Sequence, residues 1–292
     1  MRITDLLGDS GPFLSLEFFP PKEKGSWPDF FKEVDKLKEI NPLFVSVTYG
    51  AGGGTQANTL EIVARLRKEH GFEPMAHLTC VGASEEKLRG FLDGLEREGI
   101  DNVLALRGDP PRGGESFEPS DQKFRHASDL VAFIKACYPG LGVGVAAYPE
   151  THPAAVSAED DLRYLKLKLD RGGDFAITQL FFDNGYYWDF VEKARAIGID
   201  KPIIPGVLPI FNIKTVDKIA SLCGAVIPSG LRENLNSARE RGGEEAVMAV
   251  GVEHARAQAQ NLLDNGAPGV HLYTLNKAEA CLGLFRKLRI PR

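Results

Sequence analysis

The sequence predicts a closed barrel of eight parallel strands alternating with helices, the (βα)8 or TIM-barrel class of α/β folds. Short apolar, β-branched runs alternate eight times with longer segments of helical periodicity, a pattern typical of parallel β-α units. The chain has 292 residues, close to the typical length of about 250 residues for this fold. The first strand ends in EFFPP, whereas an open doubly wound sheet usually carries a glycine-rich fingerprint there.

The eight expected strands lie at 13–19, 43–49, 74–79, 102–107, 142–148, 175–182, 202–208 and 269–275. The helices expected between them lie at 28–40, 55–69, 84–98, 126–137, 158–171, 186–197, 212–222 and 277–288. Ser84 and Ser157 stand where two of these helices start, and a serine hydroxyl is a favourable cap there. The segment 228–266 is too long for a loop, which indicates two extra helices before the last strand. Without repeats or a long linker, residues 1–292 are expected to form one catalytic domain.

Composition excludes several classes of protein. The formal net charge is −5, and acidic and basic residues are mixed without a basic tract, so no nucleic-acid partner is expected. The polar start and the lack of 18 consecutive apolar residues predict neither a signal peptide nor a membrane span, and hence a cytoplasmic protein. The four cysteines are far apart and form no CxxC pair. We therefore expect buried or semi-buried free thiols and no metal site.

Polar residues gather at the predicted strand ends. In a (βα)8 barrel the chemistry takes place at the carboxyl ends of the strands, so these positions predict a large polar ligand site at the barrel mouth. The residues concerned are Glu17, Thr48, Tyr49, His77, Thr79, Arg107, Asp109, Tyr148, Glu150, His152, Thr178, Gln179, Asp183, Tyr273 and Asn276.

Glu17 is the sharpest of these signals. It lies among Leu16, Phe18 and Phe19, where an ionised carboxylate is unfavourable unless it is paired. Such surroundings favour the protonated form, which suits a general acid. The alternative is a structural ion pair with a nearby Arg or Lys.

Four further features are weaker signals. The segment RGDPP at 107–111 combines a flexible glycine with two stiff prolines, so it is either a ligand loop or a tight turn with a salt bridge. His77 is as often a core residue as a ligand contact. The glycine-rich loop 50–55 could approach phosphates at the following helix. Lys166 and Lys168 form either a solvated helix face or part of the site.

The strand-end segments together resemble the methylenetetrahydrofolate reductase family, in its bacterial single-domain type. The resemblance runs in order from residue 15 to residue 279 and so covers nearly the whole chain. The matching segments are SLEFFPPK, FVSVTYGAGG, AHLTC, NVLALRGDPP, VAAYPETHP, ITQLFFD, IIPGVLPI and HLYTLNKAE.

This resemblance implies a barrel that holds FAD non-covalently and reduces 5,10-methylenetetrahydrofolate to 5-methyltetrahydrofolate, which supplies methyl groups for methionine synthesis. NADH or NADPH would deliver hydride to the flavin and leave, and the folate would then use the same site, in a ping-pong mechanism. The protein would supply orientation and electrostatics. Relatives are homo-oligomers, so an oligomer is implied here too.

The resemblance also implies residue roles. Glu17 would be the general acid that opens the folate ring, and Asp109 would contact the folate and tune the flavin. The implied FAD contacts are Thr48, Tyr49, Ala51, His77, Arg107, Gly108, Asp109, Ala127, Tyr148, His152, Ala155, Asp161 and Lys168. The implied folate contacts are Gln179, Thr215, Tyr273 and Lys277. Some relatives have glutamine where Thr215 stands and arginine where Lys277 stands, which changes a bidentate contact into a point charge.

Two alternative functions stay open. A flavin barrel could act on another amine-type substrate, such as proline. Comparing the turnover of folate with that of proline would distinguish this alternative from a folate reductase. The chain could also be a flavin subunit that receives electrons from an iron–sulfur partner protein. Such a subunit would bind FAD and show little NAD(P)H oxidation alone.

Overall fold

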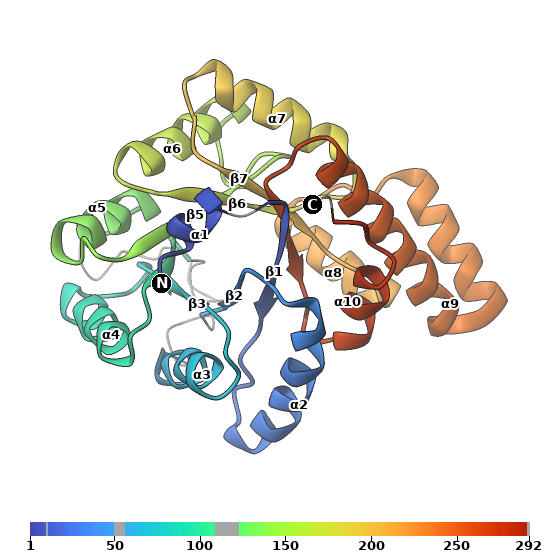
Figure 1. The fold of residues 1–292 in the computed structure, drawn as a ribbon. Helices are drawn as coiled ribbons and strands as arrows, with labels where there is room; N and C mark the ends of the chain where they lie inside the picture. Colours follow the sequence, from blue (N-terminus) through green and yellow to red (C-terminus); the bar gives the residue numbers. More distant parts are fainter. Residues whose placement is uncertain (10, 50–55, 109–122, 291–292) are drawn as a thin grey trace.

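The computed structural model of the chain describes residues 1–9, 11–49, 56–108 and 123–290. Eight strands form a closed barrel in sequence order, and every neighbouring pair is parallel (Figure 1). They are β1 (Phe13–Phe18), β2 (Phe44–Val47), β3 (Pro74–Thr79), β4 (Asn102–Leu106), β5 (Gly142–Ala147), β6 (Phe175–Leu180), β7 (Ile203–Val207) and β8 (Gly269–Tyr273). The predicted (βα)8 fold is confirmed.

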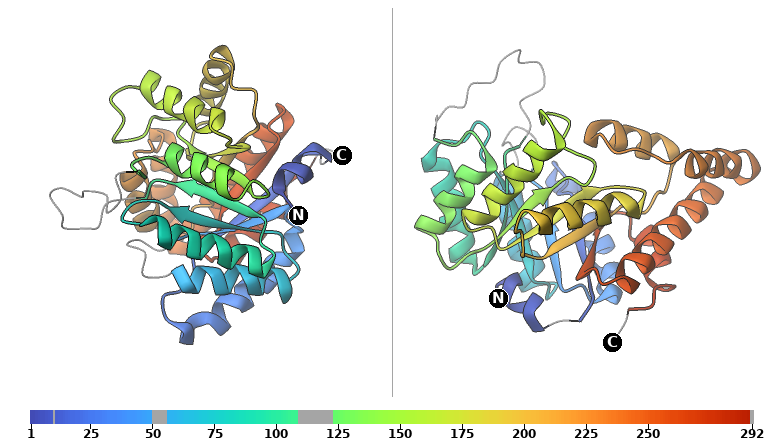
Figure 2. Two further views of the ribbon diagram at one scale, coloured as in Figure 1. Left: turned by 90° about the vertical axis from the view of Figure 1, so that its left-hand side faces the viewer. Right: turned by 90° about the horizontal axis from the view of Figure 1, so that it is seen from above.

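Helices surround the barrel, as Figures 1 and 2 show. They are α1 (Ile3–Asp9), α2 (Trp27–Leu37), α3 (Gln56–Lys68), α4 (Glu85–Glu98), α5 (Ala127–Cys137), α6 (Ala158–Asp170), α7 (Asn184–Ala196), α8 (Ile213–Cys223), α9 (Ser229–Asp264) and α10 (Ala278–Phe285), with short 3-10 turns at Lys24–Ser26 and Lys38–Ile40. The predicted caps are confirmed: Ser84 accepts a hydrogen bond from the Lys87 N–H, and Ser157 accepts one from the Asp160 N–H.

The extra helical segment before β8 is also confirmed. Gly242 and Gly243 have non-helical backbone angles inside α9, so the element consists of two helices joined by a kink. α9 packs against α10 and β8, and it extends beyond the ring of the other helices (Figure 2).

Helix α1 was not expected from the sequence. It is short, and its anchor is the fully buried Ile3. The Ile3 N–H donates to Oδ1 of Asn102 at 2.7 Å, and Nδ2 of Asn102 donates to the Met1 carbonyl at 2.9 Å. A single buried side chain within residues 3–8, the part of the helix whose burial is described, is too weak a periodic signal to predict a helix, and α1 depends on these tertiary contacts.

The barrel interior changes character along its axis. The end where the strands begin is filled by an apolar cluster of Ile3, Phe13, Phe44, Met75, Leu104, Phe175, Ile177 and Ile204. Because alternate residues of a strand point to the same side, Ser15 and Glu17 both face inward above this cluster. His271 and Tyr273 follow the same alternation on β8, which pairs with β1. The polar side chains therefore lie towards the carboxyl ends of the strands.

All four cysteines are free thiols, as expected, but one of them is not buried. Cys80 and Cys281 are buried and Cys223 is partly buried, whereas Cys137 is exposed. Cys137 is the last residue of α5, and its Sγ lies 3.4 Å from the Arg89 guanidinium on α4. The helix ends with this side chain on its outer surface, so the expectation of burial was wrong there.

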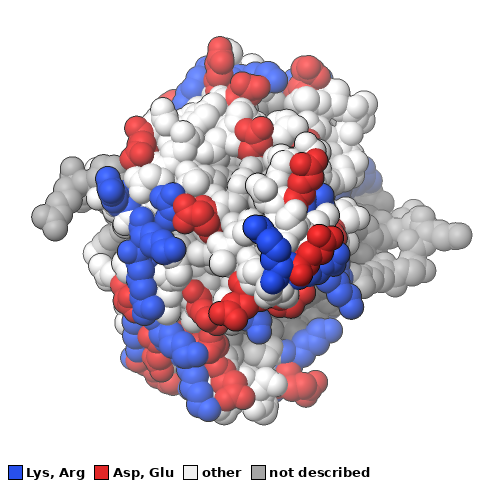
Figure 3. Space-filling model, turned by 90° about the vertical axis from the view of Figure 1, so that its right-hand side faces the viewer, with Lys and Arg blue, Asp and Glu red and all other residues white. Residues whose placement is uncertain are grey.

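The surface carries both signs of charge. On the face drawn in Figure 3, Lys and Arg side chains are interspersed with Asp and Glu. Many pairs lie one helical turn apart, such as Lys32 with Asp29 and Arg256 with Glu253. Among the described helices, none has the length and apolar character needed to cross a membrane.

Candidate active site at the barrel mouth

Two adjoining pockets open at the carboxyl ends of the strands. The first, here called the cation pocket, has a volume of about 360 Å³ and is lined by Ala105, Leu106, Arg107, Gly108, His126, Ala127, Ser128, Ala146, Tyr148, His152, Ala154, Ala155, Val156, Asp161, Tyr164 and Lys168. The second, here called the acid pocket, has about 350 Å³ and is lined by Glu17, Phe19, Thr48, His77, Leu104, Leu106, Ala146, Tyr148, Ile177, Gln179, Leu180, Leu208, Ile219, Leu222, Cys223, Tyr273 and Leu275. Leu106, Ala146 and Tyr148 belong to both walls, so the pockets are neighbours.

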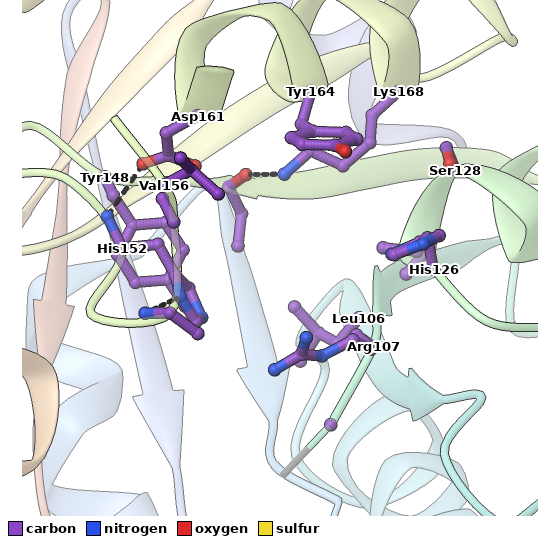
Figure 4. Close-up of a pocket in the computed structure, with 16 residues that line it drawn as sticks. Leu106, Arg107, His126, Ser128, Tyr148, His152, Val156, Asp161, Tyr164 and Lys168 are labelled. Atoms are coloured by element: carbon purple, nitrogen blue, oxygen red, sulfur yellow. Dashed lines mark hydrogen bonds between the residues drawn. The ribbon is translucent and has the colours of Figure 1, made fainter. Parts of the chain in front are cut away.

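Lys168 is the central cation of the first pocket (Figure 4). It reaches in from α6, and its Nζ donates to the Ala146 carbonyl at 2.5 Å. Burial lowers the pKa of this ammonium group to about 8, although nearby Asp161 acts in the opposite direction. Lys166 instead pairs with Asp170 on the outer face of the same helix. Of the two lysines, Lys168 is the one that lies in the site.

The loop after β5 is held by side chains of the pocket itself. Asp161 accepts a hydrogen bond from the His152 N–H at 2.8 Å, and Nδ1 of His152 accepts one from the Ala154 N–H at 3.0 Å (Figure 4). The rings of Tyr148 and His152 meet edge to face with centroids 4.6 Å apart. This wall is therefore already ordered around the pocket.

Glu17 lies at the floor of the acid pocket and is 6% exposed. The end of β1 is clamped by the loop after β8. The Thr274 hydroxyl donates to the Glu17 carbonyl at 2.5 Å. Asn276 accepts from the Phe19 N–H at 3.0 Å and donates to the Phe19 carbonyl at 2.6 Å. The backbone that carries the carboxyl group is thereby fixed.

Two imidazole rings approach the Glu17 carboxyl group, and the Arg or Lys partner considered above is not found among the described residues. Oε2 of Glu17 lies 3.4 Å from Nε2 of His77 and 3.7 Å from Nε2 of His271. Burial lowers the pKa of His77 to about 4, so this ring is neutral near pH 7. Within the described residues Nε2 of His77 is buried without a hydrogen-bond partner. Such an atom on a pocket wall is suited to contact a ligand.

Gln179 and Tyr273 also line the acid pocket. The Tyr273 hydroxyl donates to the Thr178 carbonyl at 2.7 Å. Burial, together with the charge of Glu17, raises the pKa of Tyr273, so that the phenol stays protonated. A Cβ atom on Gly206 would lie 2.6 Å from the Tyr273 ring and 2.4 Å from the Thr178 carbonyl oxygen. Position 206 in β7 must therefore be glycine for the Tyr273 ring to occupy this position.

Most of the predicted site residues come together in the two pockets. Gly108, with φ of +84°, lies where a Cβ atom would meet Val81 and Thr79 at 2.7 and 2.9 Å, so the loop after β4 needs glycine there. Ala51 and Asp109 lie outside the described residues, and their roles stay predictions.

Three predicted contacts lie outside both pockets. Tyr49 packs edge-on against Phe91 of α4, and burial raises its pKa to about 12. Thr215 is in the first turn of α8, where its N–H donates to Asn212. Lys277 lines a separate hollow between α2, α9 and α10. Their predicted ligand contacts are not evident in this arrangement.

Sequence reasoning missed the polar layer beneath Glu17. Ser15, Ser46 and His271 are fully buried, and the hydroxyl groups of Ser15 and Ser46 lie 2.8 and 3.4 Å from the two ring nitrogens of His271. The signal was present in the alternation of the strands, since Ser15 precedes Glu17 by two residues and His271 precedes Tyr273 by two.

Comparison with known proteins identifies the family. The family model for methylenetetrahydrofolate reductase matches residues 2–289. The chain is 39% identical over 284 residues to methylenetetrahydrofolate reductase (NADH) 1 of Arabidopsis thaliana, which covers 94% of this chain and 48% of the plant protein. It therefore spans about half the length of that relative. It is 36% identical over 277 residues to 5,10-methylenetetrahydrofolate reductase of Escherichia coli, covering 95% of this chain and 90% of the bacterial protein.

A solved structure supports the fold. A Clostridium thermocellum protein described as binding two copies of 5-methyl-5,6,7,8-tetrahydrofolic acid superimposes with a TM-score of 0.65, at 15% identity and with 98% of each chain covered. At this identity the likeness shows the shared barrel. The family model, together with the bacterial relative, shows that the chain belongs to the methylenetetrahydrofolate reductase family.

Proposed function

We propose that the protein reduces 5,10-methylenetetrahydrofolate to 5-methyltetrahydrofolate, with FAD as cofactor and NADH or NADPH as electron donor. Family membership supports this reaction. The observation that carries the proposal is the buried carboxyl group of Glu17 on the wall of a pocket at the barrel mouth. The reaction needs a proton donor at such a place.

The residues of the two pockets suit a flavin dinucleotide. Lys168, Arg107 and the N-terminus of α5 at Ala127 and Ser128 would hold the diphosphate, because cations and free helix N–H groups favour phosphate oxygens. The small side chain of Ala146, shared by both walls, leaves space for a flat ring between the pockets. Nε2 of His77, which has no hydrogen-bond partner among the described residues, offers it a polar contact. When bound, FAD would supply hydride transfer between nicotinamide and folate.

Glu17 would act on the folate. Neutral methylene folate is a poor hydride acceptor, so its five-membered ring must open to an iminium ion, and this step needs a proton on the leaving nitrogen. The Glu17 carboxyl group would hold that proton in a site with little water and transfer it to the nitrogen as the carbon–nitrogen bond breaks. Gln179 and Tyr273, on the same wall, would orient the pterin.

One site would serve both substrates in turn. Leu106, Ala146 and Tyr148 are common to both pockets, so the nicotinamide and the pterin would each approach a bound flavin through the same acid pocket. The nicotinamide nucleotide would therefore leave before the folate binds. Asp109, if it lies near the bound flavin, would lower the flavin potential by disfavouring added negative charge.

The test is a stopped-flow comparison of the two half-reactions. Purified protein reconstituted with FAD should lose its flavin absorbance with NADH or NADPH and regain it with methylene folate. Glu17→Gln should keep flavin reduction and lose folate reduction. The matched control is Glu73→Gln, the same change at the opposite end of the barrel, where Glu73 pairs with Arg67.

Other outcomes would overturn the proposal. A protein that cannot bind FAD would refute it. Equal loss of both half-reactions in Glu17→Gln would remove the acid role of Glu17. FAD binding without NAD(P)H oxidation would instead favour a subunit that receives electrons from an iron–sulfur protein. Turnover of proline rather than folate would favour the other amine-type substrate.

A further inference from the structure

A buried polar layer lies directly beneath Glu17 and has no part in the function described so far. It consists of Ser15 on β1, Ser46 on β2 and His271 on β8, all with no exposed surface. In the register of the barrel, Ser15 is the partner of His271, and Glu17 is the partner of both Ser46 and Tyr273. The layer separates the apolar cluster at the start of the strands from the acid pocket.

Packing alone does not explain a histidine at this place. The His271 ring stacks on Phe44, with centroids 5.9 Å apart and an interplanar angle of 17°, and a phenylalanine ring could do the same. Polar groups in a barrel interior are unfavourable unless they have partners. Here Nδ1 of His271 lies 2.8 Å from Oγ of Ser15, and Nε2 lies 3.7 Å from Oε2 of Glu17.

We propose that His271, held by Ser15, is a positioning residue for the proton donor Glu17. In the arrangement we propose, the Ser15 hydroxyl is the donor to Nδ1 of His271, which puts the ring hydrogen on Nε2, on the side of Ser46 and Glu17. Nε2 now lies 3.4 Å from Oγ of Ser46 and 3.7 Å from Oε2 of Glu17, which is beyond hydrogen-bond reach. When the Glu17 proton passes to the folate nitrogen, the remaining carboxylate would attract Nε2–H and close this gap. No proton moves to His271. The proposal rests on the proposed function of Glu17.

The other groups facing Glu17 have different positions. His77 on β3 approaches the same Oε2 atom, but it lines the acid pocket and can also touch a ligand. Tyr273 on β8 lines the pocket too, and its hydroxyl is directed to the Thr178 carbonyl. His271 is absent from that wall and is fully buried. It therefore does not bind the folate directly. It reaches the pocket wall through Glu17 and through an edge-to-face contact with the Tyr273 ring, with centroids 5.4 Å apart.

The test uses His271→Phe, which keeps a ring against Phe44 and removes both nitrogens, and Ser15→Ala, which keeps the ring and removes its hydroxyl partner. Both half-reactions are followed by stopped flow across pH in the FAD-loaded protein. A hydrogen bond to a charged group contributes enough that His271→Phe should slow folate reduction about tenfold or more. The pH at which this half-reaction loses half its rate should rise, because the carboxylate has lost a donor. Flavin reduction by the nicotinamide should keep its rate.

Ser15→Ala should move the pH midpoint in the same direction by a smaller amount, and it remains informative should His271→Phe not fold. His271→Gln, which restores an N–H donor, should recover part of the rate. The control is His70→Phe, because His70 stacks on Phe31 outside the barrel at 4.9 Å and should leave both half-reactions unchanged.

The outcomes separate the two proposals. If Glu17→Gln abolishes folate reduction while His271→Phe and Ser15→Ala keep the wild-type rate and pH midpoint, the positioning role is refuted and the acid role stands. A slower His271→Phe with an unchanged midpoint would mean a purely structural role and would also refute it. If Glu17→Gln retains folate reduction, the acid role itself fails.

Discussion

The cation pocket and the acid pocket share three wall residues and differ in chemistry. The first places Lys168 and Arg107 beside a helix N-terminus, as anion recognition requires. The second places a carboxyl group among largely apolar side chains and two imidazole rings. In the proposed function, the first pocket binds the charged diphosphate and the second transfers a proton. A substitution in one pocket should therefore affect one function and spare the other.

The largest expected effect comes from Lys168→Met in the cation pocket. Loss of a hydrogen bond to a charged group is worth about 1.5–3 kcal/mol, so the dissociation constant of FAD should rise about tenfold or more. Once saturated with FAD, the variant should still reduce folate. Titration of apoprotein with FAD, followed by fluorescence, measures the constant. Lys166→Met, two residues away on the outer face, is the matched control, and equal weakening in both variants would remove the distinct role of Lys168.

Gly206→Ala should affect the acid pocket alone. Its Cβ atom would meet the Tyr273 ring at 2.6 Å and a backbone oxygen at 2.4 Å, so the tyrosine or the strand must move. Overpacking of this kind costs about 1–3 kcal/mol, and the KM for folate should rise while FAD affinity is kept. Thermal unfolding and steady-state kinetics measure the two effects. A wild-type KM would show that Tyr273 is not seated by this glycine.

Affinity for FAD should also fall as the pH rises in the wild-type protein, and it should not do so in Lys168→Met. Burial lowers the pKa of Lys168 from 10.5 to about 8. Below pH 8 the charged ammonium group attracts the diphosphate, and above it that attraction is lost. The same shift means that cofactor-free protein gains stability between pH 8 and 10.5, where the unfolded chain binds the proton more strongly. FAD titrations from pH 7 to 10 should show a slope that is absent in Lys168→Met.

The smallest effect is expected for Tyr273→Phe. It keeps the ring on the pocket wall and removes one neutral hydrogen bond to the Thr178 carbonyl, which is worth about 0.5–1.5 kcal/mol. Folate reduction should slow by a few fold, and flavin reduction should not change. An effect as large as that of Glu17→Gln would mean that the phenol, rather than the carboxyl group, donates the proton.

The sequence predicted the barrel well because each strand is an apolar run that can be recognised from its own residues alone. It also predicted the mouth, since strand ends must lie there. It did not predict α1, which depends on Asn102 and a single buried isoleucine. It predicted a ligand contact for Tyr49, whose ring packs on Phe91 outside both pockets, and that contact stays a prediction. Side-chain direction at a strand end depends on contacts with other elements, and one sequence does not contain them.

The buried layer under Glu17 is a second case in which one sequence does not reveal contacts between distant residues. Ser15 and His271 are 256 residues apart in the chain, and only the closed barrel makes them neighbours. Their alternation with Glu17 and Tyr273 could have placed them on the inner face. The partnership between them required the register of β1 against β8.

The clamp of Asn276 and Thr274 on the end of β1 joins positions 257 residues apart. Contacts of such long sequence separation form late when a chain folds. The backbone of Glu17, the proposed proton donor, is therefore held in place only when the eighth strand docks on the first. A ribosome-bound chain that has emerged as far as β7 would carry every group of the cation pocket and still lack an oriented acid.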